Sequence, residues 1–203
     1  MTGFLAGHWA DAQEAKIGKQ AGDPADESLG DHRYAAGVAV IFITGMSGTG
    51  KSTVLGELAR LGYRTVDTDY GDWMEEVPEP GGAGTELQWC EARIAELIAR
   101  HEVSGAPLFI AGTVRNQGRF YPRFDQVVLF SAPVEVMLER IAIREGNPFG
   151  KARDEREQII KDTAEVEPLL RASATLEIDT RQPLADTVRQ LRDLISPAKT
   201  GKP

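Results

Sequence analysis

The chain has 203 residues, of which 41% are hydrophobic and 27% charged, values typical of a globular protein. The formal net charge of −8 disfavours nucleic acid and anionic membranes as partners, and no apolar run approaches the length that spans a bilayer. The single cysteine excludes an intrachain disulfide, and the first residues lack the basic start and apolar core of a signal peptide. We expect one cytoplasmic α/β domain, present as a monomer or a homodimer.

Residues 1–37 differ from the rest of the chain. Residues 18–37 are rich in Gly, Ala and Asp and carry no sustained apolar period. We expect an N-terminal extension that is partly disordered or loosely packed, either a variable tail or a regulatory or dimerising arm. The main domain should span residues 38–197, with a tail at 198–203.

From residue 38 onward, short apolar runs alternate with amphipathic segments. The predicted strands are residues 38–43, 63–66, 107–111, 126–130 and 175–178. The predicted helices are residues 54–61, 85–101, 134–144, 154–170 and 183–195, and Thr85 is expected to cap the second of them. This alternation predicts a parallel sheet with right-handed crossovers, and ligands at the carboxyl ends of its strands.

The most informative motif is G-M-S-G-T-G-K-S-T at residues 45–53, which matches G-x-x-x-x-G-K-[ST] between a predicted strand and a predicted helix. Its glycines permit backbone N–H groups to converge on phosphate oxygens at a helix N-terminus, which favours anions. Lys51 can reach the β- and γ-phosphates, and the Ser52 hydroxyl can ligate Mg²⁺. The motif predicts a nucleoside triphosphate site formed by Gly45, Ser47, Gly48, Thr49, Gly50, Lys51, Ser52 and Thr53.

Two carboxylates follow the second predicted strand, at the sheet edge that should face this loop. Asp67 can hold Mg²⁺ directly or through water, together with Ser52. Asp69 can orient an acceptor hydroxyl or accept its proton. The alternative is that both aspartates only solvate a loop.

Basic residues surround a break between two predicted helices. Arg140 and Arg144 are four residues apart on one helix face, and three further basic residues follow the Asn147-Pro-Phe-Gly break. Phosphoryl transfer needs positive charge on the transferred group, so residues 145–156 are predicted to form a lid that brings Arg144 to the phosphates. The alternative is an exposed connection between helices that carries ordinary surface charges.

A polar segment follows the third predicted strand at the same sheet edge. In residues 112–119, Thr113, Arg115 and Asn116 offer hydrogen-bonding groups to a polar acceptor. We therefore include these three with Asp69 as candidate substrate residues.

These motifs resemble those of the P-loop small-molecule kinases of the shikimate kinase, gluconate kinase and adenylate kinase group. The resemblance spans residues 41–195 and implies a three-layer P-loop fold with a five-stranded parallel sheet in the order 2-3-1-4-5 and a small lid. Asp67 and Asp69 look like the shikimate kinase pair that serves Mg²⁺ and the substrate hydroxyl. Residues 144–151 are similar to the lid entry of gluconate kinase, and the resemblance places residues 179–183 near the adenine.

Three departures argue against shikimate as the substrate. Ala111-Gly-Thr113 stands where shikimate kinases carry a glycine triplet. The arginine that those kinases use for the substrate carboxylate is replaced near Trp89-Cys90, and the arginine expected just before Pro168 is missing, with Val166 and Glu167 in that region. The resemblance therefore implies the reaction type and leaves the acceptor open.

The sequence thus predicts an enzyme, a kinase that uses ATP and Mg²⁺ to phosphorylate a small polar acceptor, with Lys51, Asp69 and Arg144 in catalysis and Arg140 also on the nucleotide. One alternative is a nucleoside or nucleoside monophosphate kinase, in which Arg115 and Arg119 would meet the acceptor phosphate. Another is a nucleotide-binding sensor without catalytic activity. A regulatory GTPase is disfavoured because the chain has no N-K-x-D motif.

Overall fold

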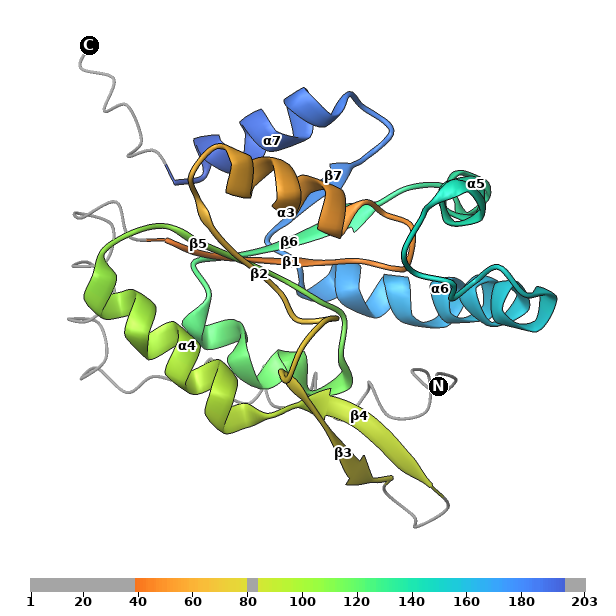
Figure 1. Ribbon diagram of the computed structural model, residues 1–203, viewed down its shortest axis with the longest axis horizontal. Helices are drawn as coiled ribbons and strands as arrows, with labels where there is room; N and C mark the ends of the chain where they lie inside the picture. The colour runs from red at the N-terminus through yellow and green to blue at the C-terminus, as the bar shows by residue number, and fades with distance from the viewer. Residues whose placement is uncertain (1–38, 80–83, 196–203) are drawn as a thin grey trace.

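A parallel five-stranded sheet forms the centre of the computed structural model, which describes residues 39–79 and 84–195 (Figure 1). The strands are β1 (Val40–Thr44), β2 (Arg64–Asp67), β3 (Met74–Pro78), β4 (Thr85–Trp89), β5 (Leu108–Ala111), β6 (Gln126–Ser131) and β7 (Leu176–Asp179). The helices are α3 (Lys51–Arg60), α4 (Glu91–Ser104), the 3₁₀ segment η2 (Arg115–Arg123), α5 (Val134–Ile143), α6 (Arg153–Ser173) and α7 (Leu184–Asp193). The expected extension at 1–37 and tail at 198–203 lie outside the described residues.

The sheet has the order β2-β5-β1-β6-β7, and all its neighbouring strands are parallel. The expected order 2-3-1-4-5 differs from this numbering because β3 and β4 were not foreseen. These two strands form a separate antiparallel pair, inserted between β2 and β5. The parallel five-stranded sheet itself is confirmed.

The helix predicted from Thr85 is wrong at its start, because residues Thr85–Trp89 form β4 and α4 begins at Glu91. β4 pairs with β3 in a register that runs from Met74 opposite Trp89 to Pro78 opposite Thr85. Trp89 is fully buried and packs edge-on against Phe42 of β1, with ring centroids 5.2 Å apart. Cross-strand pairing and this anchor outweigh the weak helix preference of the segment.

The sheet is buried on both faces, which explains why its central strands are apolar without interruption. Ile41 and Ile43 of β1 point to the face that α3 and α7 cover. Val40 and Phe42 point to the opposite face, under α4 and η2. Helices α5 and α6 cover the rest of that second face, beside β6. Figure 1 shows the resulting three layers, with α3 and α7 above the sheet and α4 and α6 below it.

Gly112, directly after β5, leaves room for the contact between the buried side chains of Thr68 and Trp89. The Thr68 hydroxyl donates to the Ala111 carbonyl at 2.8 Å and accepts from the Trp89 indole N–H at 2.9 Å. A Cβ atom at Gly112 would lie only 2.0 Å from the Thr68 Oγ1. Thr68 is fully buried, so it cannot move aside without losing both hydrogen bonds.

We therefore expect Gly112→Ala to lower the free energy of unfolding by about 2–4 kcal/mol, and Tm by about 5–15 °C. Thermal unfolding followed by circular dichroism measures this change. The matched control is Gly56→Ala in α3, where a Cβ atom would meet nothing within 4 Å. That variant should be stabilised by up to about 1 kcal/mol, because alanine favours the helix more than glycine does. Equal Tm values for the two variants would contradict the packing argument.

His101 of α4 makes stability depend on pH. Its side chain is fully buried, and neither ring nitrogen has a hydrogen-bond partner among the described residues. Burial lowers the pKa of His101, as does Arg64, while Asp125 and Glu102 oppose the shift. The native state therefore binds the proton more weakly than the unfolded chain, and stability should fall as the pH decreases below about 6.5.

We expect His101→Leu to remove this loss. As the pH is lowered from about 8 to about 5.5, the Tm of the variant minus the Tm of the wild type should increase. A Tm difference that stays constant over that range would show that His101 does not carry the pH dependence.

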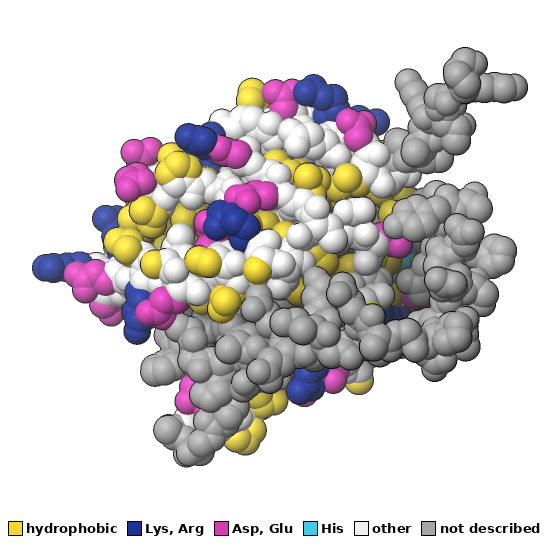
Figure 2. Space-filling view, turned by 180° about the vertical axis from the view of Figure 1, so that it is seen from behind, with side chains coloured by type: hydrophobic (Ala, Val, Ile, Leu, Met, Phe, Trp, Pro, Cys, Tyr) yellow, Lys and Arg dark blue, Asp and Glu magenta, His cyan; other side chains and the backbone are white. Residues whose placement is uncertain are grey.

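The described part of the face in Figure 2 carries basic and acidic side chains next to one another, without a broad patch of either sign. Ion pairs within one helix occur among the described residues, such as Arg100 with Glu96 and Arg153 with Glu157. None of the described helices combines the length and the apolar character that crossing a membrane requires.

Candidate active site

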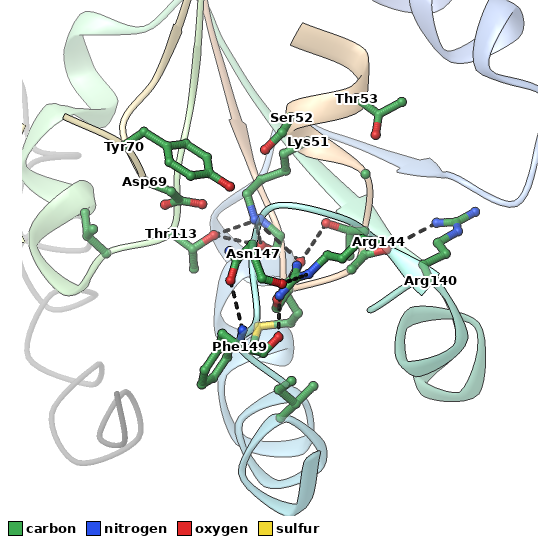
Figure 3. Close-up of a pocket in the computed structure, with 18 of the residues that line it drawn as sticks. Lys51, Ser52, Thr53, Asp69, Tyr70, Thr113, Arg140, Arg144, Asn147 and Phe149 are labelled. Atoms are coloured by element: carbon green, nitrogen blue, oxygen red, sulfur yellow. Dashed lines mark hydrogen bonds between the residues drawn. The ribbon is translucent and has the colours of Figure 1, made fainter. Parts of the chain in front are cut away.

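A cavity of about 1140 Å³ opens at the carboxyl ends of the sheet strands. The loop between β1 and α3 forms its floor, and the segments after β2, β5, α5 and β7 contribute to its walls. Every residue from Gly45 to Thr53 lines it, so the structure brings all the predicted phosphate-binding residues together. Figure 3 shows the side chains of this region.

Two glycines of this loop are required by close packing. Gly45 has φ of 147°, and a Cβ atom there would lie 2.3 Å from the Phe130 carbonyl oxygen. Gly48 has φ of 87°, and its Cβ atom would lie 2.6 Å from the Met137 carbonyl oxygen. The loop is thereby seated against β6 and α5, and it leads directly into the N-terminus of α3, where free N–H groups favour an anion.

Lys51 extends across the loop into the cavity. Its Nζ donates to the Gly45 carbonyl at 2.6 Å and lies 3.5 Å from the Met46 carbonyl. No carboxylate among the described residues forms an ion pair with Lys51. A buried ammonium group bonded only to neutral carbonyls is well suited to exchange them for phosphate oxygens.

Ser52 and Asp67 bring two oxygen donors together beside the loop. The Ser52 hydroxyl donates to the Asp67 Oδ2 at 2.6 Å. The described residues contain no cluster of three or more His, Cys, Asp or Glu side chains that could hold a metal by themselves. A hydroxyl with one carboxylate nevertheless suits Mg²⁺, which commonly takes one or two protein oxygens together with substrate phosphates and water.

Asp69 faces Lys51 and Thr113 across the cavity (Figure 3). It is accessible from the cavity, but the surrounding protein desolvates it and raises the pKa of its carboxyl, as does Asp67 to a lesser degree. Lys51 and a hydrogen bond from the Thr113 backbone oppose the shift. A carboxylate with a raised pKa is a better proton acceptor, which suits a general base.

Thr113 joins the end of β5 to the phosphate-binding loop. Its hydroxyl donates to the Gly45 carbonyl at 2.7 Å, and the Gly45 N–H donates to the Thr113 hydroxyl oxygen at 3.3 Å. Thr113 therefore lines the cavity between the loop and Asp69.

Arg144 and Arg140 enter the cavity from α5 and its end (Figure 3). Arg144 donates to the Asn147 and Phe149 carbonyls and, at 3.3 Å, to the Ser47 hydroxyl of the loop. Arg140 donates to the Thr180 carbonyl at 2.7 Å and to the Thr180 hydroxyl at 3.0 Å. Neither guanidinium belongs to any ion pair found among the described residues.

The other basic residues of the predicted lid lie elsewhere. Lys151 and Arg153 are exposed, Arg153 pairs with Glu157, and Arg156 donates to the Gly150 carbonyl at 3.3 Å. None of the three lines the cavity. Within residues 145–156, the cavity wall is formed instead by Glu145, Asn147 and Phe149.

Of the remaining candidate substrate residues, Arg115 lines the cavity and Asn116 does not. The Arg115 guanidinium forms an ion pair with Glu86 of β4, and both side chains are largely buried. Asn116 is buried against β4, where its amide bonds both the N–H and the carbonyl of Trp89, at 2.9 and 3.0 Å. Asn116 thus holds β4 in place, and its amide does not face the cavity that would receive a substrate.

The sequence interpretation missed the part of the cavity wall that β3 and β4 form. Met74 and Leu87 supply apolar surface there. The carboxylates in this part of the wall are Glu76, Glu79 and Glu86. Two runs with alternating residues around a glycine-rich turn are a hairpin signal, and they could have indicated these strands.

Comparisons with known proteins agree with this geometry. The model of a family described as the AAA domain matches residues 41–161. The structure is similar to shikimate kinase from Acinetobacter baumannii in complex with shikimate, with 23% identity, a TM-score of 0.53, and coverage of 83% of this chain and 99% of that one. It is also similar to shikimate kinase from Bacteroides thetaiotaomicron, with 19% identity, a TM-score of 0.50, and coverage of 77% and 98%. No curated protein matches the sequence. At these identities the structural likeness establishes the fold, which is that of the P-loop kinases.

Proposed function

Because the chain belongs to the AAA domain family, with a complete phosphate-binding loop in the matched region, we propose that it is an ATP-dependent kinase that phosphorylates a hydroxyl group of a small polar acceptor. One observation carries the proposal. The cavity at the phosphate-binding loop has a volume of about 1140 Å³ and continues past Asp69 to the hairpin that β3 and β4 form. Pockets for one small ligand usually have volumes of about 300–1,000 Å³, so this larger space suits a nucleotide and an acceptor side by side.

In the proposed reaction, the acceptor hydroxyl oxygen forms a bond to the γ-phosphorus while the bond from that phosphorus to the bridging oxygen breaks. ADP leaves with the electrons of that bond, and the hydroxyl proton passes to the Asp69 carboxylate. Lys51 and the loop N–H groups hold the phosphates in line, and Arg144 neutralises charge on the transferred group. Ser52 and Asp67 would hold Mg²⁺, which supplies further charge neutralisation on the phosphates when bound.

The alternative kinase, one for nucleoside monophosphates, needs cations that bind the acceptor phosphate. Arg115 is paired with Glu86, and Arg119 is paired with Glu91 outside the cavity. A non-enzymatic sensor, in turn, has no need for Arg144 beside the phosphate-binding loop. Both observations favour a small-molecule kinase.

ADP release from ATP and Mg²⁺, measured against a panel of acceptors, tests the proposal. The panel contains sugars, sugar acids, amino sugars, aminoglycosides, shikimate, nucleosides and nucleoside monophosphates. We expect at least one acceptor to raise ADP release well above the rate in water, with mass spectrometry showing a phosphorylated product. If ATP binds tightly and no member of the panel is phosphorylated, the sensor becomes the better explanation.

A further inference from the structure

One end of the cavity lies at the phosphate-binding loop and the other at β3 and β4, and the charged side chains are distributed unequally between these two ends. The cations of the cavity wall are Lys51, Arg140 and Arg144, which contact the phosphate-binding loop, and Arg115, which lies near the hairpin. Beyond Asp69, which faces Lys51, its carboxylates include Glu76, Glu79, Glu86 and Asp162. The end that receives the acceptor is therefore acidic.

Among the described residues, the single cation at the acceptor end is already neutralised. Arg115 is paired with Glu86, whose other oxygen accepts from the Gln88 amide. The side chains of Arg115 and Glu86 are only 12% and 6% exposed, so water screens their attraction weakly. A carboxylate or phosphate on the acceptor would have to separate this buried pair, which is costly.

Two of the remaining carboxylates, Glu76 and Asp162, belong to no ion pair found among the described residues. Glu76 of β3 is exposed to the cavity and belongs to no ion pair found there. Asp162 of α6 is 8% exposed and lines the same cavity, and one of its oxygens accepts from the Gln158 amide at 2.6 Å. A buried carboxylate that forms no ion pair is stabilised by a positive group that enters the cavity.

On this basis, and resting on the proposed kinase function, we propose that the acceptor is a hydroxyl compound that carries a protonated amine and no carboxylate or phosphate. Glu76 and its neighbours on the hairpin bind the ammonium group and thereby place a hydroxyl near Asp69. Amino sugars and aminocyclitols have this chemistry.

The hairpin offers a matched pair of variants. Glu76 lines the cavity, whereas Glu75 does not, as expected for adjacent strand residues that point to opposite faces. Both are exposed, so neither Glu76→Gln nor Glu75→Gln should disturb the fold. The acceptors are one amino sugar, the parent sugar and the corresponding sugar acid, together with one aminoglycoside.

In the wild type, we expect the amine acceptors to have the highest kcat/KM and the sugar acid the lowest. Glu76→Gln should raise KM for the amine acceptors about tenfold, through loss of a charge-assisted hydrogen bond, and leave KM for the parent sugar unchanged. Glu75→Gln should leave KM unchanged both for the amine acceptors and for the parent sugar. Glu86→Gln, checked for folding by its Tm, releases Arg115 and should increase transfer to the sugar acid.

The outcomes separate this inference from the proposed function. A neutral or acidic acceptor preferred over the amines, with transfer that depends on Lys51, would overturn the inference and leave the kinase intact. Equal KM changes in Glu76→Gln and Glu75→Gln would also overturn it. Absence of transfer to these four acceptors and to every member of the wider panel would overturn the kinase and this inference with it.

Discussion

Replacing Lys51 with alanine should lower the rate of phosphoryl transfer by at least about 10²–10³-fold. Lys51 is the one basic residue in the motif at residues 45–53 and the first residue of α3, and its ammonium group is bonded only to the Gly45 and Met46 carbonyls. In the reaction these bonds exchange for phosphate oxygens, whose charge grows where the bond to the leaving group breaks. Alanine removes this stabilisation and puts no charge in its place.

The measurement is kcat/KM for the best acceptor, with Tm as the test of folding. Lys51 is 8% exposed, and its side chain donates only to carbonyls of its own loop, so the Tm of the variant should stay close to that of the wild type. Lys161→Ala is the control, because Lys161 is exposed on α6 and does not line the cavity. Full activity in Lys51→Ala would remove the loop lysine from the mechanism.

Asp69→Asn should reduce kcat by about 10²–10³-fold and leave the affinity for ATP nearly unchanged. The amide keeps the size of the carboxylate, but it cannot accept the hydroxyl proton. Asp72→Asn is the matched control, because Asp72 is exposed three residues away and does not line this cavity. Equal losses in kcat and in the affinity for ATP with Mg²⁺ would instead assign Asp69 to metal binding.

The same variant should be more stable than the wild type near neutral pH. Desolvation raises the pKa of Asp69 above its ordinary value of 3.8. Its ionisation is therefore more costly in the native state than in the unfolded chain, and stability is lost as the pH rises through the native pKa. Asparagine cannot ionise, so its Tm advantage should shrink as the pH falls toward about 4. A Tm advantage that is independent of pH would contradict the electrostatic explanation.

Several features of the site followed from local sequence. The phosphate-binding loop depends on three glycines, a lysine and a serine that are contiguous with a buried strand and a helix, and residues 45–53 all line the cavity. Asp69 and Arg144 also line the cavity, since Asp69 lies two residues after β2 and Arg144 directly after α5. In these cases the chain neighbours fix the direction of the side chain.

The acceptor end depended on contacts between residues distant in sequence. Thr85 as a cap predicts the start of a helix, and only pairing with Met74–Pro78 makes Thr85–Trp89 a strand. The sequence also offered Arg115 as a cation for the acceptor. Its actual partner, Glu86, lies 29 residues earlier and belongs to that same strand.

The sequence by itself determined the individual parallel strands, the phosphate-binding loop, and the positions of Asp69 and Arg144 just after regular elements, because each is encoded within a few consecutive residues. Only the tertiary structure decided the charge at the acceptor end. That charge depends on which carboxylates the hairpin brings to the cavity and on whether Arg115 is paired. Ion pairing acts through space, and the spacing of residues along the chain does not encode it.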